Sequence, residues 1–146
     1  MDRFQTPIPF HVSAKSQSGI ATPWIAEASA HPTPLTVSIP REFGGSAPGF
    51  SPEDLFALAL ENCFVATFKV FAERSNLGFE LISVNANLEV DRLPEGGLGM
   101  ARILFGITLE GASNADLAHR VLEKTSRGCM ILNSVKTEKV FQFKVA

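Results

Sequence analysis

The sequence is notable first for what it lacks. Its 146 residues include no Tyr, although there are 12 Phe, so the interior holds no phenolic hydroxyl that needs a partner. The chain has no long run of basic residues, and its net charge of −2 excludes a strongly basic nucleic-acid binder. The apolar content of 45% and the charged content of 19% exclude a disordered chain. These values describe a globular protein without a nucleic-acid partner.

Targeting and membrane signals are also weak. The N-terminal residues MDRFQTPIPF lack the basic start and apolar centre of a signal peptide. The most apolar helix-length stretch, residues 55–72, contains Glu61, Asn62 and Lys69, and its charges and modest length argue against a membrane span. We therefore expect a cytoplasmic protein with no membrane partner. Its thiols are then reduced at rest, which disfavours a permanent structural disulfide.

Residues 1–50 are expected to form N-terminal strands and a loop. The candidate strands are short and are broken by turn-forming residues, and the period-2 pattern is clearest where Thr36 and Ser38 alternate with Val37 and Ile39. The segment GGSAPGF, residues 44–50, is expected to be a loop. The three candidate strands are FHVSA, ATPWIAEA and LTVSI.

Residues 51–77 predict a long central helix. Ser51 is a good N-cap, Pro52 suits the first helical position, and Asn76 and Gly78 are stop signals. Apolar side chains cover almost the whole circumference, which is typical of a helix buried on all sides. A domain of this size has difficulty burying such a helix alone, so we expect a homodimer in which a partner chain covers part of it.

The remaining chain predicts a β-hairpin over residues 80–110, a second helix over 114–127 closed by Gly128, and a final strand over 135–146. The order is strands, helix, hairpin, helix, strand. It indicates an α+β fold in which helices pack on antiparallel sheets around a long buried central helix. We find no repeat or linker, and expect a single domain over residues 1–146.

The two cysteines, Cys63 and Cys129, lie 66 positions apart, and four interpretations are open: core packing, a structural bridge, a metal site or a redox pair. A Cys in an apolar helix is most often core packing. A metal site is disfavoured, because the chain has no CxxC motif and its three His residues are scattered. A redox role requires a group that stabilises the Cys63 thiolate, since an apolar site does not.

Glu53 is the carboxylate that could orient a cation beside such a thiolate. It lies ten residues before Cys63, which is about 15 Å along a helix, so the two cannot meet within one chain. Either Glu53 serves another site or it reaches Cys63 of a neighbouring subunit. An acidic residue in a first helical turn also has a simpler role, because it complements the positive end of the helix dipole.

The segments SPEDLFALALENCF, RGCMILNSV and IPREFGG together resemble the OsmC/Ohr family, and the resemblance covers nearly the whole chain. It implies an intertwined homodimer with the OsmC-like fold and two active sites at the subunit interface. It also implies a thiol-dependent peroxidase that reduces organic hydroperoxides, without a metal or organic cofactor. By this resemblance Cys63 is the peroxidatic thiolate, Cys129 the resolving thiol, and Glu53 orients an activating cation. A lipoyl-type dithiol is the implied reductant.

The chain departs from the family pattern at two places. The family's activating arginine has no clear equivalent, and Lys15 and Arg41 are the candidate cations. Met130 follows the second cysteine, where peroxidase members have Pro. The alternative function is therefore a non-catalytic OsmC-like dimer that binds a small apolar ligand or senses oxidants.

Overall fold

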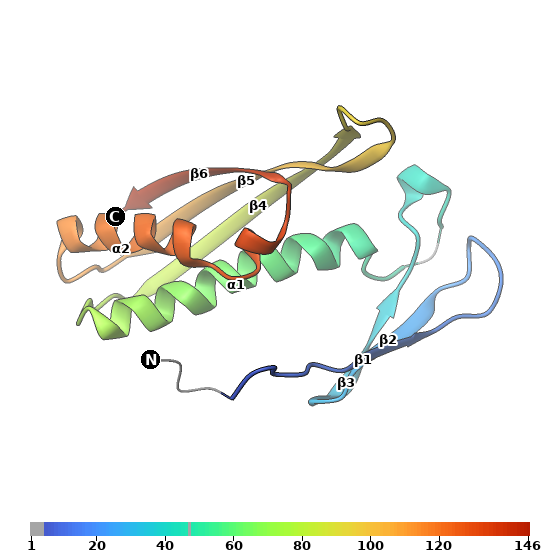
Figure 1. Ribbon diagram of the computed structural model, residues 1–146, viewed down its shortest axis with the longest axis horizontal. Coiled ribbons are helices and arrows are strands. Elements are labelled where there is room, and N and C mark those ends of the chain that lie inside the picture. Colours follow the sequence, from blue (N-terminus) through green and yellow to red (C-terminus); the bar gives the residue numbers. More distant parts are fainter. Residues whose placement is uncertain (1–4, 47) are drawn as a thin grey trace. The chain divides into compact units, whose positions relative to one another are not determined.

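The computed structural model describes residues 5–46 and 48–146 (Figure 1). The chain divides into two compact units, residues 1–55 and residues 56–146, which are described separately below. The central helix α1, Pro52–Arg74, begins at the end of the first unit and continues into the second.

The N-terminal unit contains a three-stranded antiparallel sheet in the order β1 (Val12–Lys15), β2 (Trp24–Ala28), β3 (His31–Val37). All three candidate strands of this region are confirmed. A short 3₁₀ helix, Arg41–Phe43, follows β3. Most side chains of the sheet are exposed, and Val37 is the one apolar side chain among the described residues of this unit that is fully buried.

Helix α1 begins as the sequence predicts. The Asp54 backbone N–H donates to Ser51 Oγ, and the Ser51 backbone N–H donates in return to Asp54 Oδ2, each at 3.0 Å. This reciprocal pair satisfies two groups that a helix start leaves without partners, and Pro52 occupies the first helical position. At the other end Asn76 adopts the left-handed conformation (φ 53°), which stops the helix.

Only one face of α1 is buried within the chain. The buried residues Leu60, Phe64, Phe68 and Ala72 recur every four positions, whereas Val70 is 46% exposed. Helix α1 is long and apolar enough to span a membrane, although we expected its length and charges to be unsuitable for a span. Core helices of globular proteins can have the same length and composition, and the buried face of α1 belongs to the hydrophobic core of the second unit.

The second unit contains a three-stranded sheet in the order β4 (Leu81–Arg92), β5 (Leu98–Glu110), β6 (Glu138–Val145). The predicted hairpin is confirmed, because β4 and β5 pair in antiparallel register. On β5, burial alternates strictly from residue 103 to 109, so one face of the sheet lies in the core. The buried residues are Ile103, Phe105, Ile107 and Leu109.

Strand β6 corrects one detail of the predicted fold. We expected antiparallel sheets throughout, but β6 pairs in parallel with β5. The connection between them contains helix α2 (Ala115–Gly128) and the 3₁₀ turn Leu132–Ser134, which is long enough for the crossover that parallel strands require. Asn114 caps α2, since its side chain accepts a hydrogen bond from the Leu117 N–H.

Both helices contribute to the same core as β5. Side chains from α1, β5 and α2 form a single cluster, and Phe64 and Phe105 lie within 6 Å of the Phe141 ring, at 5.9 and 5.1 Å between centroids. Helices α1 and α2 therefore cover the face of the sheet that carries the buried β5 residues. The α+β fold class predicted from the sequence is confirmed.

Candidate functional site: a cysteine pair joining the two helices

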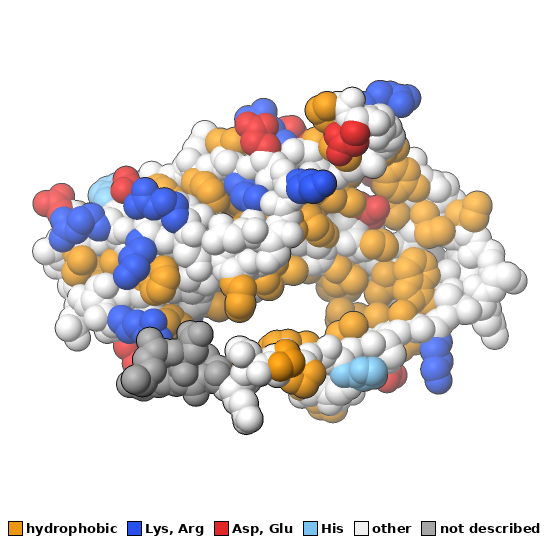
Figure 2. Space-filling view, viewed as in Figure 1, with side chains coloured by type: hydrophobic (Ala, Val, Ile, Leu, Met, Phe, Trp, Pro, Cys, Tyr) orange, Lys and Arg blue, Asp and Glu red, His pale blue; other side chains and the backbone are white. Residues whose placement is uncertain are grey.

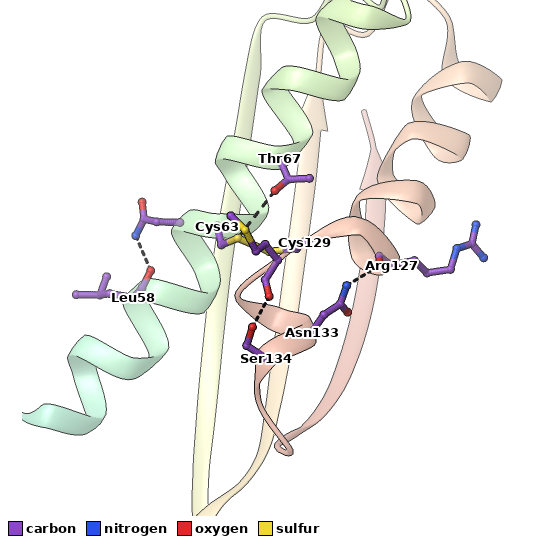
Figure 3. The surroundings of a disulfide bond; sticks show 9 residues. Leu58, Cys63, Thr67, Arg127, Cys129, Asn133 and Ser134 are labelled. Carbon is purple, nitrogen blue, oxygen red and sulfur yellow. Dashed lines mark hydrogen bonds between the residues drawn. A yellow bond between two sulfur atoms is a disulfide. The ribbon is translucent and has the colours of Figure 1, made fainter. Parts of the chain in front are cut away.

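The two cysteines, 66 residues apart in sequence, meet in the second unit. Cys63 lies in the middle of α1 and Cys129 is the C-cap of α2, and the two form a disulfide with a Cα–Cα distance of 6.3 Å (Figure 3). This distance lies within the usual range of disulfides, about 4.4 to 6.8 Å. Cys63 and Cys129, whose spacing in the sequence matches no motif, are therefore in direct side-chain contact in the fold.

The chain around Cys129 is held by local hydrogen bonds. Helix α2 ends at Gly128 and Cys129 turns to an extended conformation. The Asn133 backbone N–H then donates to the Cys129 carbonyl at 3.0 Å, while the Asn133 side chain donates to the Arg127 carbonyl at 2.9 Å. The Ser134 hydroxyl donates to the Met130 carbonyl (Figure 3). These bonds fix the residue that carries the second sulfur.

Gly128 allows the end of α2 to approach α1 closely. A Cβ atom at this position would lie 2.9 Å from the Phe71 ring, which is closer than normal contacts allow. From one turn earlier on α2, Lys124 Nζ lies 4.6 Å from the centroid of the same ring. Phe71 is two helical turns after Cys63, so α2 reaches Cys129 along one face of α1.

The two sulfur-bearing residues differ in exposure. Cys129 is fully buried, whereas Cys63 is half-buried. Of the pair, Cys63 is therefore the more exposed residue. The Cys63 Sγ also lies 3.9 Å from Thr67 Oγ1, one helical turn further along α1 (Figure 3). Sequence reasoning missed Thr67, although its i+4 spacing from Cys63 was a usable signal.

Glu53 does not join the cysteine pair within one chain. It lies in the first turn of α1, ten residues before Cys63, which corresponds to about 15 Å along the helix. Its Oε2 atom is buried and has no hydrogen-bond partner among the described residues. An unpaired buried carboxylate oxygen is unfavourable, because it has lost its water without gaining a donor.

The candidate cations are both exposed and both belong to the N-terminal unit. Lys15 is the last residue of β1, and Arg41 begins the 3₁₀ helix after β3. Neither is recorded in a hydrogen bond with the Glu53 carboxylate. Among the described residues no three His, Cys, Asp or Glu side chains cluster as metal ligands would.

The second unit has an open hollow of about 670 Å³ beside the start of α1. Its apolar lining includes Phe56, Met100 and Val135. Its charged lining carries both signs, with Arg92 and Lys136 beside Glu95 and Glu138. Phe56 lies seven residues before Cys63, which places the two on nearly the same face of α1. A hollow of this size suits a small organic molecule.

The site is thus an α+β fold in which two cysteines from different helices are joined. The family model described as OsmC-like protein matches residues 44–144, which span both units, and the chain belongs to this family. The resemblance seen in the sequence is confirmed.

Individual relatives agree with this assignment. The chain is 28% identical over 102 residues to an organic hydroperoxide resistance protein of Xanthomonas axonopodis pv. citri, covering 68% of this chain and 70% of the relative. The fold of this chain is similar to that of an OsmC-like protein of unknown function from Vibrio cholerae. The TM-score is 0.82, and the identity is 16% over 94% of this chain and 99% of the other. The organic hydroperoxide resistance protein OsmC of Legionella pneumophila gives a TM-score of 0.74 and 21% identity over 96% and 99%.

Proposed function

We propose that this protein is a thiol-dependent peroxidase that reduces organic hydroperoxides in the cytoplasm. The observation that carries the proposal is the Cys63–Cys129 disulfide in a chain of the OsmC-like family. The name of the Xanthomonas relative, an organic hydroperoxide resistance protein, supports the same class of substrate.

Each cysteine has a distinct part in the proposed reaction. The Cys63 thiolate attacks the terminal oxygen of the hydroperoxide, the O–O bond breaks, and the alkoxide leaves and takes up a proton. Cys63 is thereby oxidised to a sulfenic acid and the peroxide is reduced to an alcohol. The Cys129 thiolate then attacks the Cys63 sulfur, forming the disulfide and releasing the sulfenic oxygen as water. A lipoyl-type dithiol restores both thiols by exchange and is itself oxidised to a disulfide.

The different burial of the two sulfurs supports this order of events. The half-buried Cys63 is open to a peroxide, while the fully buried Cys129 is protected from direct oxidation and is held against Cys63 by the end of α2. If the roles were exchanged, the peroxide would have to reach a sulfur with no exposed surface.

A homodimer would complete the site. Glu53 lies too far along α1 to act on Cys63 of its own chain, and its buried Oε2 lacks a donor among the described residues. In a dimer, Glu53 of one chain would orient a cation beside Cys63 of the partner, with Lys15 or Arg41 as the candidate cation. A nearby cation lowers a thiol pKa and so favours the thiolate.

The hollow beside α1 would receive the apolar part of the peroxide. Its apolar residues Phe56, Met100 and Val135 suit an alkyl chain, and Phe56 lies on nearly the same face of α1 as Cys63. The catalytic sulfur and the hollow are therefore arranged along one side of the helix.

One observation favours the second candidate function, a non-catalytic dimer that binds a small apolar ligand or senses oxidants. Lys15 and Arg41 are both exposed, and Glu53 Oε2 is unpaired among the described residues. Without a cation beside Cys63, the protein would react with peroxide slowly and would not turn over efficiently.

The test is consumption of cumene hydroperoxide by the purified protein, with dihydrolipoamide as the reductant. The parent should consume many equivalents, and Cys63→Ser should consume none. With the dithiol left out, Cys129→Ser should consume one equivalent to form the sulfenic acid, which has no resolving thiol, and at most a second equivalent if that acid is oxidised on to the sulfinic acid. Mass spectrometry should show the stalled Cys63 as sulfenic or sulfinic acid.

Two results would distinguish the alternatives. A parent that oxidises once and is not restored by any dithiol would indicate a sensor. If both variants consume peroxide at the parent's rate, the cysteines are not the reactive groups and the redox proposal is wrong.

A further inference from the structure

The Thr67 hydroxyl faces the sulfur of Cys63. Its Oγ1 atom lies 3.9 Å from Cys63 Sγ, and this is the one hydrogen-bonding contact recorded for the Thr67 side chain (Figure 3). Both residues are half-buried and lie one turn apart on α1. Because Thr is branched at Cβ, its side chain is limited to few rotamers within a helix, and in this structure the rotamer adopted points the hydroxyl at the sulfur.

The backbone offers a competing partner to a threonine in a helix. A helical Thr can donate its hydroxyl to the carbonyl oxygen four residues earlier. Thr125 of α2 does so, since its Oγ1 donates to the Val121 carbonyl at 2.7 Å. Thr67 has the same spacing from Cys63, yet its recorded contact is with the sulfur and not with the backbone.

No charged side chain is recorded as a hydrogen-bond partner of Cys63 among the described residues. On α1 the charged groups within two turns of Cys63 are Glu61 and Lys69, and burial raises the pKa of the Glu61 carboxyl. From α2, Lys124 lies over the Phe71 ring, and Arg127 is exposed in the last turn. Thr67 is thus the one recorded hydrogen-bonding group beside the sulfur.

We infer that Thr67 is a positioning residue of the peroxidase reaction, donating its hydroxyl hydrogen to the Cys63 thiolate in the reduced protein. The inference depends on the proposed function for its catalytic meaning. The hydrogen bond itself can be tested without any peroxide. The donor stabilises the anion before attack and stays protonated throughout, so the bonds that form and break in the reaction are unchanged.

Thr67→Val tests the inference, because it removes the hydroxyl and keeps the branched shape. In a Cys129→Ala background Cys63 is the sole thiol, and its titration can be followed by thiolate absorbance and by the pH dependence of iodoacetamide alkylation. A hydrogen bond to a charged group contributes enough to change the thiolate equilibrium by about tenfold. Thr67→Val should therefore move the midpoint of both curves to a pH about one unit higher.

Two further variants serve as controls. Thr67→Ser retains the hydroxyl and should restore most of the parent's titration midpoint. Thr125→Val makes the same substitution in α2, where the hydroxyl bonds to the backbone, and should leave the Cys63 midpoint unchanged. In the protein with both cysteines, Thr67→Val should lower kcat/KM for cumene hydroperoxide about tenfold at a pH below the thiol pKa, and much less above it.

The inference is overturned if Thr67→Val titrates like the parent while remaining folded by circular dichroism. It is also overturned if Thr67→Ser is as impaired as Thr67→Val, because packing would then explain the effect. An altered thiol pKa in a protein without peroxidase activity would support the hydrogen bond and refute the proposed function. If Thr67→Val leaves the Cys63 thiol pKa unaltered and the protein is an active peroxidase, the hydrogen bond is refuted and the proposed function is supported.

Discussion

The two units of the chain differ sharply in how well they bury their own apolar side chains. In residues 56–146, two helices and a sheet share one core, and Phe64, Phe68 and Phe105 have almost no exposed surface. In residues 1–55, a sheet with the same number of strands leaves its apolar side chains open, with Val12 71% exposed and Ile25 43% exposed. The second unit thus contains a hydrophobic core, whereas the described part of the first unit buries one apolar side chain, Val37.

The difference shows why the N-terminal sheet needs a covering surface. Small isolated sheets are at best marginally stable, because they bury too little apolar area to offset the loss of chain entropy. The N-terminal sheet has an open hollow of about 590 Å³ lined largely by apolar residues, among them Val12, Ala14 and Leu35. Figure 2 shows hydrophobic side chains at the surface, while Lys and Arg side chains gather over α2. These exposed apolar groups support the proposed homodimer.

The largest expected effect is in the core of the second unit. Phe64→Ala removes a fully buried ring that contacts the Phe141 and Phe143 rings. It should lower the free energy of unfolding by about 3–5 kcal/mol, measured by urea denaturation. Ile25→Ala in the N-terminal sheet, where the parent side chain is 43% exposed, is the comparison. An equal loss in both variants would contradict the contrast between the units.

A charge on the N-terminal sheet should weaken the dimer. Val12→Glu places a carboxylate among exposed apolar side chains and would bury it at the proposed interface. The dimer dissociation constant should rise at least about thirtyfold, an effect of about 2 kcal/mol, in light scattering over a concentration series. Gln142→Glu adds the same charge at an exposed position of β6 and should leave the dimer intact. A parent that is monomeric at every concentration would refute the dimer.

Glu53→Gln should lower peroxidase activity with little loss of stability. Its buried Oε2 has no partner within the described chain, so a neutral amide costs the monomer little. In the proposed dimer the carboxylate orients the cation beside the partner's Cys63, and its loss should reduce kcat/KM about tenfold. Asp54→Asn changes the neighbouring carboxylate of the helix cap and should affect stability more than activity. If Glu53→Gln lowered stability more than activity, Glu53 would not belong to the proposed site.

The smallest expected effect concerns Glu61. Burial raises the pKa of its carboxyl, so the folded chain binds this proton more tightly than the unfolded chain. The stability contributed by the neutral carboxyl is then present below its ordinary pKa and falls as the pH rises through the raised value. Glu61→Gln should be slightly more stable than the parent at pH 7, by about 0.5 kcal/mol or less because solvent screens this only partly buried carboxyl, and equal to it at pH 3. Thermal unfolding at both pH values checks the sign.

Much of the fold could be predicted because its signals are local. The Ser51–Pro52 helix start, the Asn76 stop and the alternation of the hairpin each depend on residues close in sequence. The parallel pairing of β6 could not be predicted, since the same alternating pattern suits either strand direction. The contact between Cys63 and Cys129 could likewise not be predicted from residue patterns alone, because it joins residues 66 positions apart through the packing of two helices. Residue patterns alone therefore left four interpretations of these cysteines open.

The site was predicted in part for the same reason. The family resemblance identified the two cysteines and Glu53, but Thr67 was passed over because a Thr in an apolar helix is usually unremarkable. The geometry brings together Cys63, Cys129 and Thr67 and leaves Glu53 about three helical turns away. The placement of Lys15 or Arg41 beside the Cys63 sulfur of a partner chain stays a prediction, because no local sequence signal determines a contact between two chains.

The most direct test of the central claim is a stoichiometric titration of the fully reduced protein with cumene hydroperoxide. Thiols are counted after each addition, and the products are mapped by peptide mass spectrometry. We predict that one equivalent of peroxide removes both thiols and produces one intramolecular Cys63–Cys129 disulfide per chain. If both thiols survive an excess of peroxide, or if the mapped disulfides join different chains, the proposed mechanism is contradicted.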